Sequence, residues 1–232
     1  VNMHNQEDSY IDDLGALILA AGQGTRMYSE KPKVLQTLLQ VPMFSYVHNA
    51  LSPVVGPNNI WSVIGFQAEQ IVQRYPEQID HFIYQKERLG TGHALKTAAP
   101  VLKDKGIRFC LVVNGDAPLI STRALSQFIE QAWEEDCSIG LMTLQLNDPG
   151  SYGRVLRNEQ GQVQAIIEAR DFCAQEHDHH SNEVNTGIYF LNLSAISPLL
   201  KQLSCENLQK EYYITQLVDL AVLNNLKIFA QP

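Results

Sequence analysis

The sequence is poor in positive charge. Its 17 lysine and arginine residues are outnumbered by 25 aspartate and glutamate residues, which gives a formal net charge of −8 at pH 7. Because proteins that bind along a nucleic-acid backbone need a basic face to displace counterions, this balance argues against a nucleic-acid partner. If the chain binds a phosphate compound, the cations that meet it must be gathered locally.

Closely spaced cysteines are also lacking. The four cysteines, Cys110, Cys137, Cys173 and Cys205, are far apart and form no C-x-x-C pair. This spacing excludes a dense disulfide framework and a zinc ribbon, and it favours free thiols in a reducing compartment. The adjacent residues 177–180 (HDHH) do not have the spacing of a structural zinc site either.

The chain has no long apolar run. Its first 15 residues are polar and acidic without the apolar core of a signal peptide, and no apolar stretch reaches membrane length. We therefore expect a soluble, cytoplasmic protein with no membrane partner. Since the sequence starts at Val1 rather than at methionine, residues 1–13 are expected to be a disordered or expression-derived tail.

The stretch 17–35, LILAAGQGTRMYSEKPKVL, combines an apolar run, glycines and cations. Residues 17–20 have the continuous apolar character of a strand that is buried on both faces of a parallel sheet. Ala21, Gly22 and Gly24 then form a loop with almost no side chain, so its backbone N–H groups can approach a ligand closely. The cations that follow are Arg26, Lys31 and Lys33. The pattern predicts a phosphate-binding loop, with Lys31 as a solvated surface charge.

Strand-like and helix-like segments alternate after this loop. We expect helices from Pro42 to about 51, at 68–74, at 91–102 with Pro100 ending or kinking it, and from Ser121 to about 135. We expect strands at 60–65, 81–85, 108–113 and 138–146. Such alternation predicts an α/β fold with a Rossmann-like, mostly parallel sheet, whose ligand lies at the carboxyl ends of the strands.

The pattern changes beyond Pro149. The segments GRVLRN and VQAIIEAR predict an antiparallel hairpin, and NTGIYFLN predicts a further strand. We interpret residues of about 150–192 as a smaller antiparallel insertion that recognises a second substrate. With no repeat or linker evident, residues 14–232 are expected to form one domain.

Several motifs together resemble a known family. They are LAAGQGTRM followed by KPK, Gln85 with LGTGHA, GDAPLI, YGR, Glu168 in IEARD, VNTG, and EYYIT. In this order they resemble the sugar-phosphate nucleotidylyltransferases, and within them the uridylyltransferase half of the bifunctional N-acetylglucosamine-1-phosphate uridylyltransferases and glucosamine-1-phosphate acetyltransferases. The resemblance extends over nearly the whole chain from about Leu17.

The resemblance implies an enzyme that transfers a uridylyl group from UTP to N-acetylglucosamine-1-phosphate, with Mg²⁺ as cofactor. The products would be pyrophosphate and UDP-N-acetylglucosamine, a precursor for cell-wall polymers. Both reactants are polyanions, so catalysis must neutralise charge and align the attack on the α-phosphorus.

The resemblance also assigns residues to roles. The catalytic cations would be Arg26, whose planar fork suits a phosphate, and Lys33, a point charge. The nucleotide would be bound by Leu19, Ala20, Ala21, Gly22, Gln85, Gly90 and Thr91. The sugar would be bound by Asn114, Gly115, Gly153, Glu168 and Asn185. Asp116, just past a strand end, would hold Mg²⁺, a hard cation that takes few protein ligands beside substrate phosphates.

The chain departs from the family pattern in three places. Asn114 stands where close relatives often have tyrosine, and Arg170 stands where lysine is common. The sequence also stops at Pro232, before an asparagine that is the family's second metal ligand and before the left-handed β-helix domain. We therefore expect no acetyltransferase activity, impaired metal binding, and no trimer held by that domain, while other oligomers stay possible.

Two alternatives stay open. One is another nucleotidylyltransferase, acting on a different sugar phosphate or small-alcohol phosphate. The other is a non-catalytic nucleotide-sugar-binding protein, which the missing metal ligand suggests. A dinucleotide-binding fold is disfavoured, because Met27 stands where its third glycine is expected and no acidic residue closes the second strand.

Overall fold

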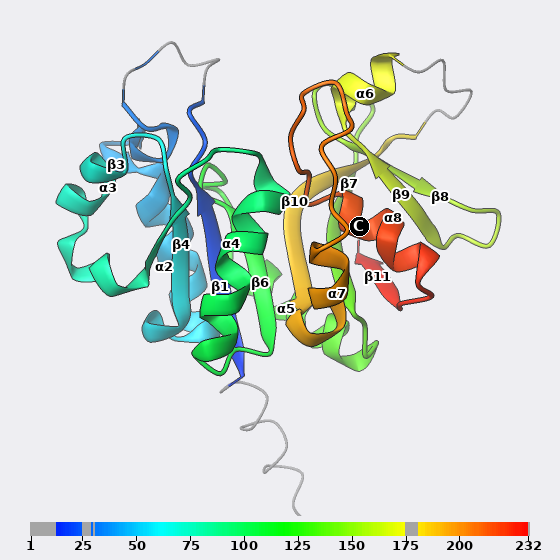
Figure 1. The fold of residues 1–232 in the computed structure, drawn as a ribbon, viewed down its shortest axis with the longest axis horizontal. Helices are drawn as coiled ribbons and strands as arrows, with labels where there is room; N and C mark the ends of the chain where they lie inside the picture. The colour runs from blue at the N-terminus through cyan, green and yellow to red at the C-terminus, as the bar shows by residue number, and fades with distance from the viewer. Residues whose placement is uncertain (1–12, 25–28, 30, 175–180, 232) are drawn as a thin grey trace, which may run out of the picture. The chain divides into compact units, whose positions relative to one another are not determined.

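The computed structural model describes residues 13–24, 29, 31–174 and 181–231. Its contacts divide the chain into two compact units. The first contains the described residues of Val1–Arg88 and Thr97–Gln127, and the second contains those of Leu89–Lys96 and Phe128–Pro232. Each unit has its own strands and helices, which Figure 1 labels.

The first unit is built on four parallel strands (Figure 1). β1 (Leu14–Ala20) pairs with β4 (Ile60–Ile64) on one side and with β6 (Phe109–Asn114) on the other, and β4 pairs with β5 (Phe82–Tyr84). Six of the seven residues of β1 are buried, which explains its continuous apolar sequence. Because all four strands are parallel, their carboxyl ends meet at one edge of the sheet.

Two helices of this unit follow the sequence prediction closely. α2 (Met43–Val55) contacts β1, and its residues Phe44, Val47 and Leu51 are buried at the predicted helical spacing. Pro42 is the N-cap rather than the first helical residue. α3 (Ala68–Arg74) has the predicted bounds. The short elements are η2 (Lys33–Leu35), η3 (Pro57–Asn59), η4 (Pro76–His81), β2 (Thr37–Leu38) and β3 (Val41–Pro42).

Two helices contribute residues to both units, α4 (Thr91–Asp104) and α5 (Thr122–Glu134). α5 begins as predicted, because the Ser121 hydroxyl accepts a hydrogen bond from the Ala124 N–H at 3.2 Å. Pro100 was expected to end or kink its helix, and it does not end it, since α4 runs on to Asp104. Because Pro100 has no N–H, the Lys96 carbonyl loses its helical hydrogen bond. Both residues are exposed, so water can donate to this carbonyl instead.

The second unit is largely antiparallel. β7 (Ile139–Gln145) pairs with β10 (Glu183–Asn192) in antiparallel fashion and with β11 (Ile228–Gln231) in parallel. β8 (Arg154–Arg157) pairs with both β10 and β9 (Val163–Ile167), antiparallel in each case, which confirms the predicted hairpin. The helices are α6 (Ala169–Ala174), α7 (Leu193–Leu200) and α8 (Gln216–Leu223). The unit extends beyond the predicted insertion at 150–192.

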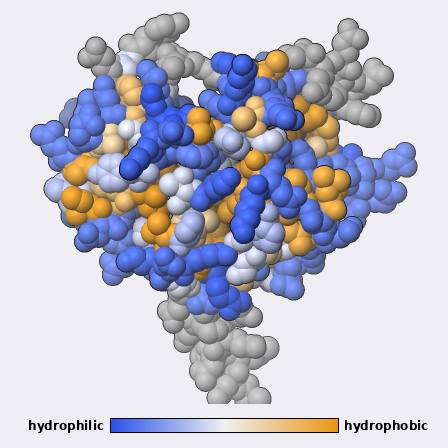
Figure 2. Space-filling view, viewed as in Figure 1, coloured by the Kyte–Doolittle hydropathy of each residue, from blue (hydrophilic) through white to orange (hydrophobic). Residues whose placement is uncertain are grey.

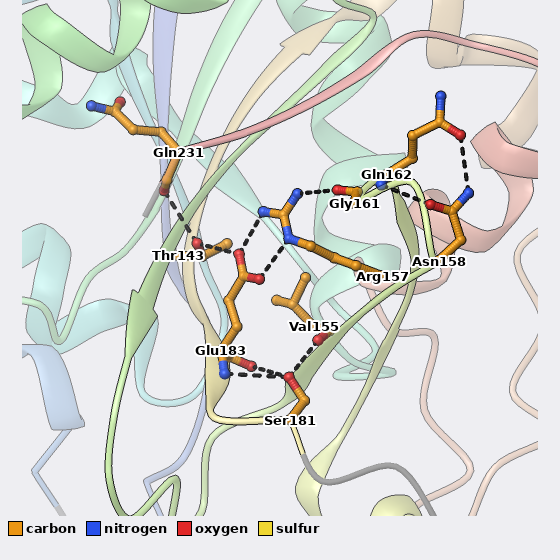
Figure 3. Close-up of polar contacts among 9 residues, drawn as sticks. All are labelled: Thr143, Val155, Arg157, Asn158, Gly161, Gln162, Ser181, Glu183 and Gln231. Carbon is orange, nitrogen blue, oxygen red and sulfur yellow. Dashed lines mark hydrogen bonds and ion pairs between the residues drawn. The ribbon is translucent and has the colours of Figure 1, made fainter.

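A buried carboxylate links three strands of the second unit (Figure 3). Glu183 of β10 accepts hydrogen bonds from the Thr143 hydroxyl of β7 and from Nε and Nη2 of Arg157 in β8, each at 2.7 Å. The Thr143 hydroxyl also lies 3.3 Å from the Gln231 carbonyl oxygen of β11. Burial alone would raise the pKa of Glu183, but the Arg157 and Thr143 hydrogen bonds hold that pKa below its usual value.

The surface of the molecule is mixed in character. Figure 2 shows hydrophilic residues over most of the face drawn, with hydrophobic residues in patches between them. Among the residues that the structure describes, no helix has both the length and the apolar character needed to cross a membrane. Asp13, assigned to the tail by the sequence analysis, is tied to β6, since its carbonyl accepts hydrogen bonds from the N–H groups of Arg108 and Phe109.

Candidate functional site

The loop after β1 is held by the strands on both sides of it. The Leu19 carbonyl accepts a hydrogen bond from the Gly115 N–H at 3.0 Å, and the Ala21 carbonyl accepts one from the Phe66 N–H at 3.2 Å. Among the described residues, a Cβ atom built on Gly22 would meet nothing within 4 Å. Leu19 and Ala20 end β1, and Ala21 and Gly22 continue into a loop that the sheet holds in place and that is open at Gly22 toward the described part of the chain.

Lys33 and Asp116 form an ion pair within the first unit. The Lys33 ammonium donates a hydrogen bond to Oδ2 of Asp116, and the two side chains are 38% and 29% exposed. Lys33 opens η2, which is anchored by the buried side chains of Val34 and Leu35. The sequence analysis singled out both charged residues, and the structure brings them together although 83 residues separate them.

Gly115 makes this pairing possible. A Cβ atom at position 115 would lie 2.8 Å from Cγ1 of Val34 and 3.2 Å from the Leu19 carbonyl oxygen. Since real Cβ atoms essentially never approach another atom to within 3.0 Å, a larger residue at position 115 would require the Val34 side chain of η2 to shift. The sequence analysis assigned Gly115 to sugar binding, and the structure adds this packing reason for glycine.

Gln85 and Asn114 lie at the carboxyl ends of β5 and β6, two strands of the same parallel sheet that are separated by β4 and β1. Gln85 is only 4% exposed and follows β5, where its N–H donates to the Ile64 carbonyl at 2.9 Å. Asn114 is the last residue of β6 and is in register with Leu19 of β1. Both residues therefore lie at the edge of the sheet where parallel α/β folds bind ligands.

Three predicted sugar-binding residues lie together in the second unit. The Asn185 N–H donates to the Gly153 carbonyl at 2.9 Å, and the Cβ position of Gly153 is 3.7 Å from Oε2 of Glu168. The Asn185 side-chain amide donates to the Tyr189 hydroxyl at 2.7 Å. Tyr189 is 2% exposed, so it holds Asn185 from inside the core. The side-chain amide of Asn185, the carboxylate of Glu168 and the backbone of Gly153, which carries no side chain, therefore lie close together.

Glu168 lies in a partly desolvated environment. Burial raises the pKa of its carboxyl, while a hydrogen bond from the Thr215 hydroxyl, at 3.1 Å to Oε1, opposes that rise. A cavity of about 910 Å³ lies beside it, and its lining residues include Glu168, Asp171, Cys205, Tyr213, Thr215 and Asp219. A carboxylate beside a cavity of this size is suited to binding a polar ligand such as a sugar.

The sequence analysis missed two residues of this cavity. It quoted Thr215 within EYYIT but gave it no role, and it did not notice Asp219. Within the described residues, Oδ1 of Asp219 is buried without a hydrogen-bond partner, and burial raises the pKa of this carboxyl to about 6. The signal was present in the sequence, because Asp219 interrupts the apolar stretch QLVDLAVL.

Gly90 and Thr91 lie in the second unit, at the start of α4. The predicted site residues thus form two groups. Leu19, Ala20, Ala21, Gly22, Lys33, Gln85, Asn114, Gly115 and Asp116 lie in the first unit. Gly90, Thr91, Gly153, Glu168 and Asn185 lie in the second. Arg26 and the histidine-rich residues 177–180 fall outside the described residues.

Among the described candidate site residues of the first unit, Asp116 is the carboxylate that could hold a metal ion. In the part of the chain that the structure describes, no group of three or more histidine, cysteine, aspartate or glutamate side chains is arranged to hold a metal. Asp116 alone, paired with Lys33, suits a hard cation that takes most of its ligands from water and phosphate, as Mg²⁺ does. It does not suit zinc, which needs three or four protein ligands.

Comparison with known sequences places the chain in a family. A family model described as "Nucleotidyl transferase" matches residues 15–228. The chain is 47% identical over 214 residues to a protein named "Bifunctional protein GlmU" from Nitratidesulfovibrio vulgaris strain DP4, covering 92% of this chain and 46% of that protein. A protein of the same name from Acinetobacter baumannii strain AYE is 38% identical over 212 residues, covering 91% and 45%. The chain spans about half the length of these relatives.

Solved structures with low sequence identity share the fold. A structure from Bacillus anthracis, described as a glucose-1-phosphate thymidylyltransferase, has a TM-score of 0.73 at 17% identity and covers 94% of this chain and 86% of that one. HddC from Yersinia pseudotuberculosis has a TM-score of 0.65 at 20% identity, with coverage of 94% and 89%. These matches confirm the predicted fold class.

Proposed function

The chain belongs to the nucleotidyl transferase family, and on that premise we propose that it transfers a uridylyl group from UTP to N-acetylglucosamine-1-phosphate. The products are UDP-N-acetylglucosamine and pyrophosphate. The observation that carries the proposal is the Lys33–Asp116 pair beside the open loop after β1, because it provides a cation and a carboxylate at the ligand-binding edge of a parallel sheet.

Lys33 serves as the charge that meets the reacting phosphates. An ammonium group has three N–H donors, so Lys33 can keep its bond to Asp116 and also donate to a phosphate oxygen. The phosphate nucleophile is already ionised near neutral pH and needs no general base. Catalysis therefore depends on alignment and on neutralising the charge that grows on the leaving pyrophosphate, to which Arg26 also contributes.

The backbone from Leu19 to Gly22 holds the nucleotide, and Gln85, Gly90 and Thr91 recognise its base. Gly22 has open space where a side chain would be, so a nucleotide can approach its N–H directly. Asp116 is the residue that holds Mg²⁺. When bound, this ion supplies charge neutralisation for the substrate phosphates.

Asn114, Gly115, Gly153, Glu168 and Asn185 recognise the sugar. A carboxylate accepts hydrogen bonds from hydroxyl groups, whereas an amide both donates and accepts, which suits the acetamido group. The partly desolvated Glu168 makes stronger directional bonds than an exposed carboxylate would. The thiols of Cys110, Cys137 and Cys205 are free, which agrees with a reducing compartment such as the cytoplasm.

The test is pyrophosphate release from this chain, measured with a panel of nucleoside triphosphates and sugar phosphates, with and without Mg²⁺. We expect selective, Mg²⁺-dependent release with UTP and N-acetylglucosamine-1-phosphate. Lys33→Ala and Asp116→Asn should each lower kcat by about a hundredfold or more, since each removes an interaction with charge that develops in the transition state. Lys103→Ala, at an exposed lysine near the end of α4, is the matched control and should keep wild-type turnover.

The outcomes separate the possible functions. Release with another pair of substrates would identify a different nucleotidyltransferase. Binding of UDP-N-acetylglucosamine without any release would identify a nucleotide-sugar-binding protein. Wild-type turnover in Asp116→Asn would refute the assignment of the metal ligand.

A further inference from the structure

A short segment of the second unit lies directly against the proposed base-recognition loop. The Tyr212 N–H donates to the Leu89 carbonyl at 2.7 Å, and the Gly92 N–H donates to the Tyr212 carbonyl at 2.7 Å. This is a backbone pairing through both the N–H and the carbonyl of Tyr212, with residues 123 and 120 positions earlier in the sequence. We call residues 212–215 the strap.

The two glycines of the loop are required by the strap. A Cβ atom on Gly90, whose φ is +103°, would lie 2.6 Å from the Tyr212 carbonyl oxygen. A Cβ atom on Gly92 would lie 2.9 Å from the carbonyl carbon of Tyr213. Backbone atoms cannot give way as the end of a flexible side chain can. The glycines in LGTGHA therefore make room for protein backbone.

A side chain of the loop strengthens the contact. The Ile214 N–H donates to the Thr91 hydroxyl oxygen at 3.1 Å. Ile214 is 5% exposed, so its N–H would lack an easy substitute partner if this acceptor were lost. Thr91, which the proposed function assigns to base recognition, therefore also holds the strap in place.

The other end of the strap reaches Glu168, which the proposed function assigns to sugar binding. Thr215 is 2% exposed, and its hydroxyl donates to Oε1 of Glu168 at 3.1 Å. One run of four residues thus contacts the base-recognition loop at Tyr212 and Ile214 and the sugar-binding carboxylate at Thr215.

The strap is itself held in place. The Asn207 side chain donates to the Glu211 carbonyl at 2.6 Å and accepts from the Glu211 N–H at 3.2 Å. The Gln209 side chain donates to the Tyr213 hydroxyl at 2.7 Å. On the other side of the strap, the Gln216 side chain accepts a hydrogen bond from the Ser204 N–H at 2.9 Å and donates one to the Ser204 hydroxyl at 3.0 Å. With both flanks anchored, a displacement at one end of the strap is transmitted to the other end.

We propose that the strap couples recognition of the base to recognition of the sugar, with Thr91 and Thr215 as positioning residues at its two ends. The proposal rests on the proposed function for the identity of the two ligands. The physical link is a continuous path inside one compact unit: hydrogen bonds join residues 89–92 to Tyr212 and Ile214, the backbone of the strap leads to Thr215, and a hydrogen bond joins Thr215 to Glu168.

The test uses variants that change one hydrogen bond and keep the side-chain volume. Thr215→Val removes the donor to Glu168, and Thr91→Val removes the acceptor for the Ile214 N–H. Thr215→Ser and Thr91→Ser restore the hydroxyl groups. Ser197→Ala, which removes a hydroxyl bond to the Leu193 carbonyl in α7, is the control outside the strap.

Two measurements report the coupling. Steady-state kinetics give KM for each substrate at saturating levels of the other, and hydrogen exchange gives the protection of the amides in residues 89–92 and 212–215. We expect Thr215→Val to raise KM for the sugar phosphate about tenfold, as for loss of a bond to a charged group. We also expect it to raise KM for UTP about fivefold and to speed exchange in the loop. Thr91→Val should show the reciprocal pattern, and both serine variants should restore wild-type values.

Each result decides the proposal. If Thr215→Val changes only the sugar-phosphate KM, Thr91→Val changes only the UTP KM, and exchange stays local, the strap does not couple the sites. If the wild-type chain shows no turnover with these substrates while Thr215→Val still speeds exchange at residues 89–92, the proposed function fails and the mechanical link stands. If the chain is inactive and exchange stays local, both fail.

Discussion

Replacing Glu183 with glutamine should destabilise the second unit strongly. Its side chain is 6% exposed and that of Arg157 is 29% exposed, and three hydrogen bonds of 2.7 Å reach the carboxylate. Glutamine has one acceptor where glutamate has two, so its NH₂ group must face an Arg157 donor, and Arg157 loses its counter-charge. Removing one partner of a buried pair costs about 3 to 5 kcal/mol, and the partial exposure of Arg157 places our expectation at about 3 kcal/mol.

The assay follows unfolding of the second unit alone. Trp61 and Trp133 are the two tryptophans, and they lie in the first and second unit respectively. In a Trp61→Phe background, fluorescence therefore reports the unit that contains Glu183. A loss of about 3 kcal/mol should lower the thermal midpoint by roughly 6 to 12 °C for a chain of this size.

The matched control is an exposed ion pair in the same unit. Lys227 and Glu135 are 3.1 Å apart with side chains 57% and 50% exposed, so Glu135→Gln should change the free energy of unfolding by less than about 1 kcal/mol. Equal effects of Glu183→Gln and Glu135→Gln would refute the reasoning, because the two pairs differ in their burial and in the number of hydrogen bonds to the carboxylate.

The same substitution has a pH signature. The pKa of Glu183 is lowered in the folded chain, so its contribution to stability is present above the ordinary glutamate pKa of about 4.3 and is lost as the pH falls through the lower folded value. The difference in unfolding free energy between wild type and Glu183→Gln should be constant from pH 7 to 5 and should shrink below about pH 4.3.

Three further changes have definite expected results. Burial raises the pKa of Asp219 to about 6, so folding stability should fall as the pH rises from about 4 to 6. Asp219→Asn should remove that loss. Urea unfolding should show that the variant is more stable than wild type by up to about 3 kcal/mol at pH 8 and not more stable at pH 3. Gly115→Ala should shift the Val34 side chain of η2 and lower turnover by at least about tenfold, whereas Gly22→Ala, with open space at its Cβ, should fold with wild-type stability. Cys110 and Cys137 are buried with raised thiol pKa values, so mass spectrometry after brief alkylation at pH 8 should find Cys205 modified before either.

The order of strands and helices was predictable because local sequence encodes it. The run before Asn114 is apolar throughout and forms the buried strand β6, and the spacing of Phe44, Val47 and Leu51 produces the buried side of α2. Of the two outcomes expected at Pro100, the end of the helix does not occur, because the carbonyl that proline leaves without its helical donor can find another partner. On an exposed helix face water supplies one.

The candidate site was predictable only in part. Lys33 and Asp116 were found because each lies next to a local signal, a glycine-rich loop and a strand end. Their pairing was not predicted, since it depends on the packing of Val34 against Gly115. The contacts of Thr215 with Glu168 and of Ile214 with Thr91 join segments 47 and 123 residues apart, and no periodicity within either segment reveals them.

The Lys33–Asp116 pair reconciles an acidic chain with ligands that are themselves polyanions. A free cation at the end of β6 would attract any anion, and a free carboxylate would repel a nucleotide. Paired, they present a locally neutral surface in which each charge is only partly shielded, because both side chains remain about a third exposed. A phosphate that approaches Lys33 together with a divalent cation at Asp116 gives each member of the pair a second partner. Under the proposed function, recognition at this edge of the sheet would therefore require phosphate and metal together, which would select metal-bound nucleotides over simple anions.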